Sequence, residues 1–402
     1  MQSTTIARQV LPIVLAAALF LAPGAPAGAS PKNADLPADV LPALHYLLDL
    51  AKQEGRIDFD AAHIAPFITF LMSTKPAGTV YSAGDSFGAP SAYNEFNVGS
   101  DLQRIASYAI NADIPACTLW PSSLRMSRWT QVHGGYQQLA RLRSASARLE
   151  EPFIVQGSEH VTITPDQTTG GYYSYDVDKT IISSPYQKGK LLISIYVQQG
   201  PSAVGKKGLV LGSDDDWSYL YTNKDGLNLT GLGWIKSYMY DSFSVCAYYQ
   251  ADPDRPLVKY GAVSWVKAGW SGMNMVKSKH IHQGMLRAAD AFKSVIEDPN
   301  LPDAAILAST FSESRDLPTP TLKRYAGNYF ESLEARIAAS ESLRQKVDKD
   351  FDGRTILEQM TRDELYAVLA LDYLKKLLGR DAVLDSHPFD ADSPGARRIG
   401  SL

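Results

Sequence analysis

The sequence has few features that would identify a function directly. Its net charge is only −4 over 402 residues, so it offers neither a basic surface for nucleic acid nor a polybasic patch for anionic lipid. It has two cysteines, Cys117 and Cys246. In an oxidising compartment they can pair, but their spacing does not decide between a disulfide and two buried thiols. No internal repeat and no low-complexity segment is present.

Long apolar runs are also scarce, and the one that stands out lies near the N-terminus. Arg8 is the only charged residue before a nearly unbroken apolar run at 11–21, and the triplet Ala-Gly-Ala follows at 27–29. Signal peptidase requires such a basic start, apolar stretch and small-residue site, whereas a membrane span needs about 20 apolar residues. Residues 1–29 are therefore predicted to be a cleavable signal peptide, with an uncleaved anchor helix as the alternative. The mature protein is expected to be soluble and periplasmic or secreted, with no stable membrane span and no cysteine for a lipid anchor.

Residues 30–90 are predicted to form a helical hairpin followed by a linker. Apolar residues recur at helical spacing in two stretches, and Gly55 lies between them as a helix stop. The two apolar faces are Val40, Leu41, Leu44, Leu47, Leu48 and Ala51, and Ile64, Phe67, Ile68 and Leu71.

Residues 91–299 are predicted to contain a sheet. Ser100 and Gln103 have the spacing of a capping box at the start of a helix, and the stretch after that helix is expected to be irregular. Across 153–266 apolar residues alternate with polar ones between turn residues, which is typical of antiparallel strands. A long helix with an apolar stripe over 281–296 closes the region.

Residues 300–402 are predicted to be helical again. Thr361 and Glu364 form a second possible capping box, and Gly379 is expected to end the last helix. The whole chain is therefore expected to be an α+β protein, with an antiparallel sheet between N- and C-terminal helical regions.

The middle region resembles the helix-grip architecture of START-type lipid-binding domains. The resemblance rests on the order of a short strand, a helix, an irregular stretch, antiparallel strands and a long final helix. It also rests on the segment Ala-Gly-Trp-Ser-Gly-Met-Asn-Met at 268–275, which leads into that helix. The resemblance implies a curved sheet gripping the long C-terminal helix of the domain, with an apolar ligand cavity between the two.

Large amphipathic side chains in this region are candidates for lining such a cavity. Aromatic rings bury much area and keep one polar end, although ordinary sheet packing explains the same residues. An apolar small molecule or lipid is the expected partner; nucleic acid, cofactors and metals are not expected. The candidate ligand-binding residues are Tyr196, Tyr240, Tyr260 and Trp265 from the sheet and Met285, Ala289 and Phe292 from the helix.

No catalytic residue is predicted, and whether the protein is an enzyme stays open. The run from Gly269 resembles the nucleophile motif G-x-S-x-G, but Met273 occupies the position of its last glycine. Two alternatives to ligand binding remain. One is a periplasmic hydrolase with an unrecognised site, for which a cluster of His160, an acidic residue and a hydroxyl would be evidence. The other is an envelope interaction protein without a ligand.

Overall fold

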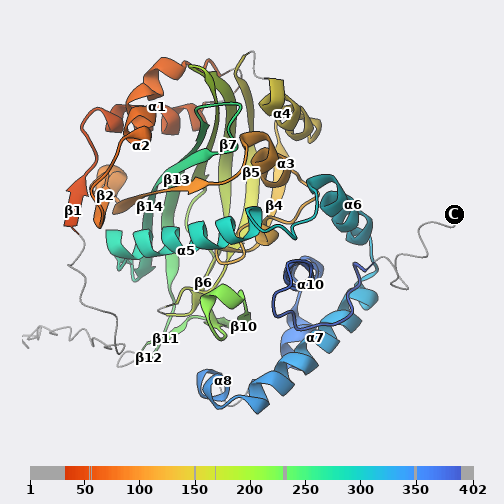
Figure 1. The fold of residues 1–402 in the computed structure, drawn as a ribbon. Coiled ribbons are helices and arrows are strands. Elements are labelled where there is room, and N and C mark those ends of the chain that lie inside the picture. The colour runs from red at the N-terminus through yellow and green to blue at the C-terminus, as the bar shows by residue number, and fades with distance from the viewer. Residues whose placement is uncertain are drawn as a thin grey trace, which may run out of the picture.

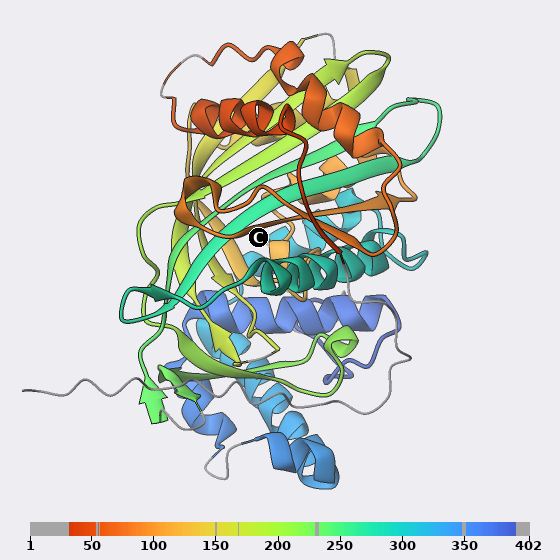
Figure 2. The ribbon, with the colours of Figure 1, turned by 90° about the vertical axis from the view of Figure 1, so that its left-hand side faces the viewer.

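The computed structural model describes residues 32–53, 55, 57–148, 151–167, 169–229, 233–347 and 351–390. The predicted α+β class is confirmed: a large antiparallel sheet carries helices on both faces, and a group of helices follows at the C-terminus (Figures 1 and 2). Its strand order is β15-β14-β13-β8-β7-β5-β4, and β3 pairs with the part of β14 that β15 leaves free. Among the described residues, its strands are β3 (Ser91–Val98), β4 (Leu124–Val132), β5 (Phe153–Ile163), β7 (Ser174–Tyr186), β8 (Gly189–Gln198), β13 (Tyr238–Gln250), β14 (Val258–Trp270) and β15 (Met273–Asn274).

The N-terminal hairpin covers one face of this sheet. Its helices α1 (Val40–Ala51) and α2 (Ala65–Met72), joined through the short η1 (Ala61–Ile64), coincide with the two predicted apolar stretches. Because side chains alternate across a strand, one row of each central strand faces these helices. That row includes Leu191, Ile193 and Ile195 of β8, Val245 and Ala247 of β13, and Val263 and Trp265 of β14.

Glu95 of β3 joins the end of this hairpin to the sheet. Its carboxylate is paired with Lys75, which follows α2, and with Lys259 of β14 at 2.9 Å, and it accepts a hydrogen bond from Tyr93. Burial alone would raise the pKa of Glu95, but these three partners outweigh it and hold the pKa below the usual 4.5. The charged form is therefore the one that the fold stabilises.

Replacing Glu95 by glutamine is expected to lower the free energy of unfolding by about 1–3 kcal/mol at pH 7, because three hydrogen-bonded partners lose a charged acceptor. The contribution of Glu95 should be complete above its ordinary pKa of 4.5 and should disappear as the pH falls below that value. Urea denaturation between pH 7 and pH 3 measures both effects. Glu331→Gln, at an exposed position of the C-terminal region, is the control; equal effects of the two variants at every pH would contradict this role of Glu95.

Helices also cover the second face of the sheet, which carries the candidate site. The predicted long helix is confirmed as α5 (Ser278–Ile296), which crosses this face beside β3 (Figure 1). The predicted cap at Ser100 is wrong, since the side chain of Asp101 accepts the hydrogen bond from the N–H of Arg104 at 2.7 Å. The prediction of an irregular stretch before residue 153 is also wrong, because that stretch contains an edge strand and a helix. The remaining elements of this part are α3 (Leu102–Ala109), η3 (Ala116–Thr118), β4 and α4 (Gln137–Arg148).

The C-terminal helices share one apolar core with this second face. The capping box of Thr361 and Glu364 is confirmed at the start of the last helix. The helices of this region are α6 (Ala304–Arg315), α7 (Thr319–Ala339), α8 (Glu341–Lys346), α9 (Gly353–Gln359) and α10 (Arg362–Leu377).

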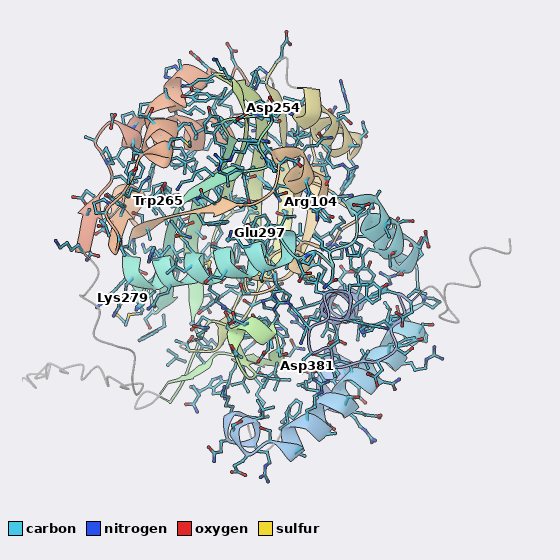
Figure 3. All side chains as sticks on the ribbon, viewed as in Figure 1. Arg104, Asp254, Trp265, Lys279, Glu297 and Asp381 are labelled. Carbon is cyan, nitrogen blue, oxygen red and sulfur yellow. The ribbon has the colours of Figure 1, made fainter. Side chains whose placement is uncertain are left out.

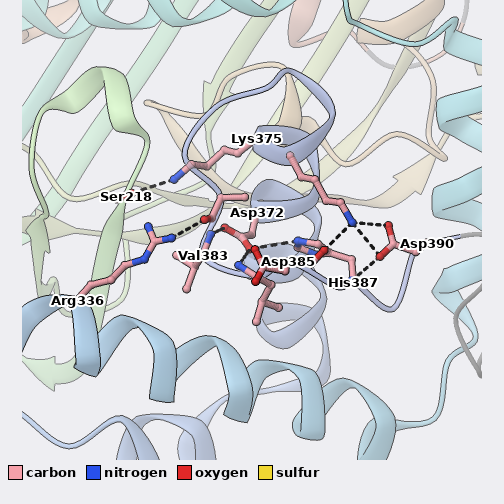
Figure 4. A network of polar contacts seen from close by, with 11 residues as sticks. Ser218, Arg336, Asp372, Lys375, Val383, Asp385, His387 and Asp390 are labelled. Atoms are coloured by element: carbon pink, nitrogen blue, oxygen red, sulfur yellow. Dashed lines mark hydrogen bonds and ion pairs between the residues drawn. The ribbon is translucent and has the colours of Figure 1, made fainter.

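Buried polar contacts fix the segment after α10 against that helix (Figure 4). Asp372 of α10 accepts the backbone N–H groups of residues 383 and 384 at 2.7 and 3.0 Å, and His387 lies 3.3 Å from the same carboxylate. Lys375 donates to Ser218 at 3.0 Å and so connects α10 to the residue that precedes the strand β10 (Tyr219–Asp225). Burial lowers the pKa of Lys375, partly offset by the charge of Asp372. These contacts hold α10 where it can close the second face.

Smaller sheets complete the described structure. One strand before the N-terminal helices pairs in parallel with one strand after them. Two small antiparallel sheets lie beyond one end of the large sheet (Figure 1). Their strands are β1 (Lys32–Asp35), β2 (Thr79–Ser82), β6 (Gly171–Tyr172), β9 (Lys206–Val210), β10 (Tyr219–Asp225), β11 (Leu227–Leu229) and β12 (Gly233–Ile235), and two further 3-10 turns are η2 (Ser86–Gly88) and η4 (Asp214–Asp216).

The predicted signal peptide, residues 1–29, lies outside the described residues. None of the described helices combines the length and the apolar character that a membrane crossing requires. Cys117 and Cys246 are both buried free thiols, and burial raises the pKa of Cys117 to about 12. The question that the sequence left open is thus answered in favour of two buried thiols in this structure.

Candidate ligand-binding site

A cavity of about 1640 Å³ lies between the second face of the sheet and the helices that cover it. Strands β4, β5, β7, β8, β13 and β14 form one wall, while α5, the loop around η3 and the start of α10 form the opposite one. The α5 wall combines small residues with larger apolar ones. The lining residues of α5 include Ile281, Gly284, Met285, Ala288 and Ala289.

Polar side chains run across the middle of the sheet wall. In the strand register, Lys179 of β7 lies opposite Tyr196 of β8, which lies opposite Ser244 of β13, which in turn lies opposite Ser264 of β14. The serines are short, so this row removes little of the cavity volume. We call the polar belt the set of lining residues Glu159, Lys179, Ser194, Tyr196, Ser244, Cys246 and Ser264.

A buried ion pair forms the charged part of the polar belt. Lys179 Nζ lies 3.1 Å from Glu159 Oε2, and both side chains are at most 10% exposed. Ser127 donates to the other carboxylate oxygen. The ammonium also lies 4.8 Å from the ring centre of Trp129 and 5.1 Å from that of Tyr196, both suitable for cation–π attraction. Burial alone would lower the pKa of Lys179, but the charge of Glu159 reverses the effect and raises it.

Tyrosines on the same wall stay neutral and keep a hydroxyl to donate. Burial raises the pKa of Tyr175 to about 12 and also raises the pKa of Tyr196, Tyr248 and Tyr260. The hydroxyl of Tyr260 lies 3.4 Å from the Cys246 sulfur. Tyr175 and Tyr196 nevertheless keep accessible surface, because they face the cavity rather than a packed core. The wall is therefore apolar in bulk and carries hydrogen-bonding groups both in the polar belt and on these tyrosines.

The structure brings four of the seven predicted site residues to the cavity. They are Tyr196 and Tyr260 on the sheet and Met285 and Ala289 on α5.

The other three predicted residues lie outside the cavity lining. Trp265 faces the opposite side of the sheet beneath the N-terminal helices, stacked on Phe243 at 5.0 Å (Figure 3). Tyr240 receives a hydrogen bond from the N–H of Gly272, and the irregular register between residues 239 and 241 places Met239 in the wall instead. Phe292 is fully buried and stacks on Trp120 at 4.3 Å, in the packed core at the far end of α5.

The ion pair and the serines of the polar belt were not predicted from the sequence. A signal for the ion pair was present, because Glu159 and Lys179 each interrupt an apolar row, between Val161 and Val155 on β5 and between Val177 and Ile181 on β7. A buried charge needs a partner of opposite charge. Because these two charges have opposite signs and lie on strands of one sheet, their pairing could have been predicted.

The described residues do not assemble a catalytic cluster around histidine. His160 accepts or donates a hydrogen bond with Asp176 at 2.7 Å, but in the described part of the chain no hydroxyl is bonded to its other nitrogen. His282 contacts the carbonyl of Tyr93 at 3.3 Å, and burial lowers its pKa. Within the same residues, no group of three or more His, Cys, Asp or Glu side chains is arranged to hold a metal ion.

No protein-family model matches the chain, and no curated protein is significantly similar to it in sequence. The function must therefore be argued from the cavity itself.

Proposed function

We propose that the protein binds an apolar or amphipathic small molecule, such as a lipid, in the cavity between the sheet and α5. The proposal includes a helix-grip arrangement similar to that of START-type domains, in which α5 is the gripped helix. The observation that carries it is the cavity volume of about 1640 Å³, which exceeds the roughly 300–1,000 Å³ of most small-molecule pockets. A space of that size suits a molecule with one or more long hydrocarbon chains.

The chemistry of the wall supports an occupant other than water alone. Protein interiors are close-packed, and apolar side chains that face a void lose dispersion contacts. Apolar residues such as Val177, Ile181, Leu192 and Ile281 line this cavity, and apolar cavities hold water poorly. An acyl chain or a comparable hydrocarbon would restore those contacts, while the polar belt would fix the orientation of a polar group.

The predicted signal peptide completes the proposal. We infer that the ligand is met outside the cytoplasm, in the periplasm or in the secreted state, where a soluble carrier would shield an apolar molecule from water. The hydrolase alternative is less well supported, because the carboxylate that accepts a hydrogen bond from Ser127 in the cavity wall, that of Glu159, is already neutralised by its ion pair with Lys179.

Native mass spectrometry of the exported protein, followed by extraction into organic solvent, tests the proposal. The expected result is a protein population carrying one or more bound small molecules, which appear in the extract as lipids or similar apolar compounds. A protein that carries no adduct and does not bind an added fluorescent lipid would contradict it and would favour an interaction protein without a ligand.

A further inference from the structure

One end of the cavity carries an excess of guanidinium groups. This end is bounded by β4, by the loop between α3 and η3, and by helices on the β4 side of the molecule, α4, α6 and α10 (Figure 1). Four arginines and two aspartates from these elements line the cavity. They are Arg128, Arg143, Arg315, Arg362, Asp113 and Asp363.

Two of the arginines are matched by the two aspartates. Arg315 lies 3.1 Å from Asp113, and Arg128 lies 3.8 Å from Asp363. All four side chains are between 44% and 69% exposed, so these pairs are weak and open to rearrangement.

The other two arginines have no carboxylate partner in the described part of the chain. Arg362 donates to backbone carbonyl oxygens at the end of α6, among them that of Leu317 at 3.2 Å. Glu364, in the same turn of α10, is already paired with a buried arginine of β4. Arg143 forms no ion pair with any described residue and is only partly exposed. Counting only the residues that the structure describes, this end of the cavity therefore has two positive charges without a carboxylate partner.

We propose that this end binds the anionic head group of an amphiphile whose hydrocarbon part occupies the cavity. The inference rests on the proposed function and names the class of ligand: a fatty acid, or a lipid with an anionic phosphate. Guanidinium groups bind carboxylate and phosphate through charge-assisted, often bidentate hydrogen bonds. The neutral Glu159–Lys179 pair lies deeper in the cavity and would contact polar groups along the chain rather than the head.

Displacement of the neutral dye Nile red from the exported protein tests the inference. Laurate and dodecyl phosphate supply anionic head groups on the same chain as dodecanol, and inorganic phosphate supplies the anion without a chain. We compare the unaltered protein with Arg143→Gln, Arg362→Gln and Arg362→Lys. Arg141→Gln is the control, because Arg141 lies on the same helix as Arg143, is exposed and does not line the cavity. Thermal unfolding confirms that each variant is folded.

The expected result is tighter binding of laurate or dodecyl phosphate than of dodecanol, with a preference that weakens at high salt. Each glutamine variant should lose roughly 10- to 100-fold in affinity for the anionic probe, because it removes one charge-assisted hydrogen bond. Dodecanol binding and the Arg141→Gln control should not change, and Arg362→Lys should retain part of the preference. Equal binding of dodecanol and both anions, unaffected by the variants, would overturn this inference and leave the proposed function intact. If inorganic phosphate alone competed, the end would be a free-anion site, and this inference would also be overturned. If none of the probes displaced the dye, the proposed function itself would be overturned.

Discussion

Replacing Ala289 by tryptophan is expected to abolish ligand binding while leaving the protein folded. Ala289 lies on the cavity wall of α5 and belongs to neither of the two packed cores. An indole at this position enters the space that a hydrocarbon chain would occupy. The affinity for a lipid should fall by about 100-fold or more, while the free energy of unfolding should fall by only about 1–3 kcal/mol, the usual range for overpacking. Lipid titration and urea denaturation measure the two effects.

Ala291 provides the matched control two residues further along α5. It is buried to a similar extent but belongs to the packed core and does not line the cavity. Ala291→Trp should therefore be destabilised at or above the upper end of the same range, and any binding that remains in its folded fraction should keep its affinity. If Ala289→Trp were as unstable as Ala291→Trp, or if it bound lipid normally, the cavity would not be the binding site.

Several elements could be predicted from the sequence because one local pattern decides each of them. The stripe along α5 and the alternation along β8 and β13 reflect burial on one side, and these elements formed where they were expected. The edge strand β4 was missed because two irregularities of register, between residues 124 and 126 and between 129 and 131, break the alternation of apolar and polar side chains. It pairs with a single neighbour, and it holds Arg125 in a buried pair with Glu364 of α10. Such a strand can be predicted only if the partner helix is already known.

The candidate site was harder to predict than the fold, because strand parity and register decide which side chains face the cavity. On β14, Tyr260 and Trp265 are five positions apart, so in a regular strand they point to opposite faces. Both were nevertheless expected in one site. On β13, the irregular register after Met239 moves Tyr240 out of the wall. A shift of this kind leaves no trace in the period-two pattern of the residues that follow it.

Removal of the buried charge at Lys179 is expected to be the most destabilising single change in the site. In Lys179→Met, the carboxylate of Glu159 would remain only 5% exposed with the hydroxyl of Ser127 as its hydrogen-bond partner. Leaving one member of a buried ion pair alone costs about 3–5 kcal/mol. The double variant Glu159→Leu with Lys179→Met should recover most of this loss, because well-packed apolar residues replace buried pairs at little cost. Lys293→Met, which breaks a partly exposed pair with Glu297 on α5, should cost less than about 1 kcal/mol.

The pH dependence of Lys179→Met separates an unpaired buried charge from a simple loss of packing. Without the ammonium, the buried carboxylate would lack its charge partner, and burial disfavours the charged form of a carboxyl group. A lower pH favours the neutral form of such a group, so the loss of stability in the variant should shrink as the pH falls. Urea denaturation at pH 7 and pH 5 should therefore show a smaller difference from the unaltered protein at pH 5. The contrary result is a destabilisation that is the same at both pH values and that the double variant does not relieve. It would mean that the methionine disrupts packing and that the ion pair does not stabilise this wall.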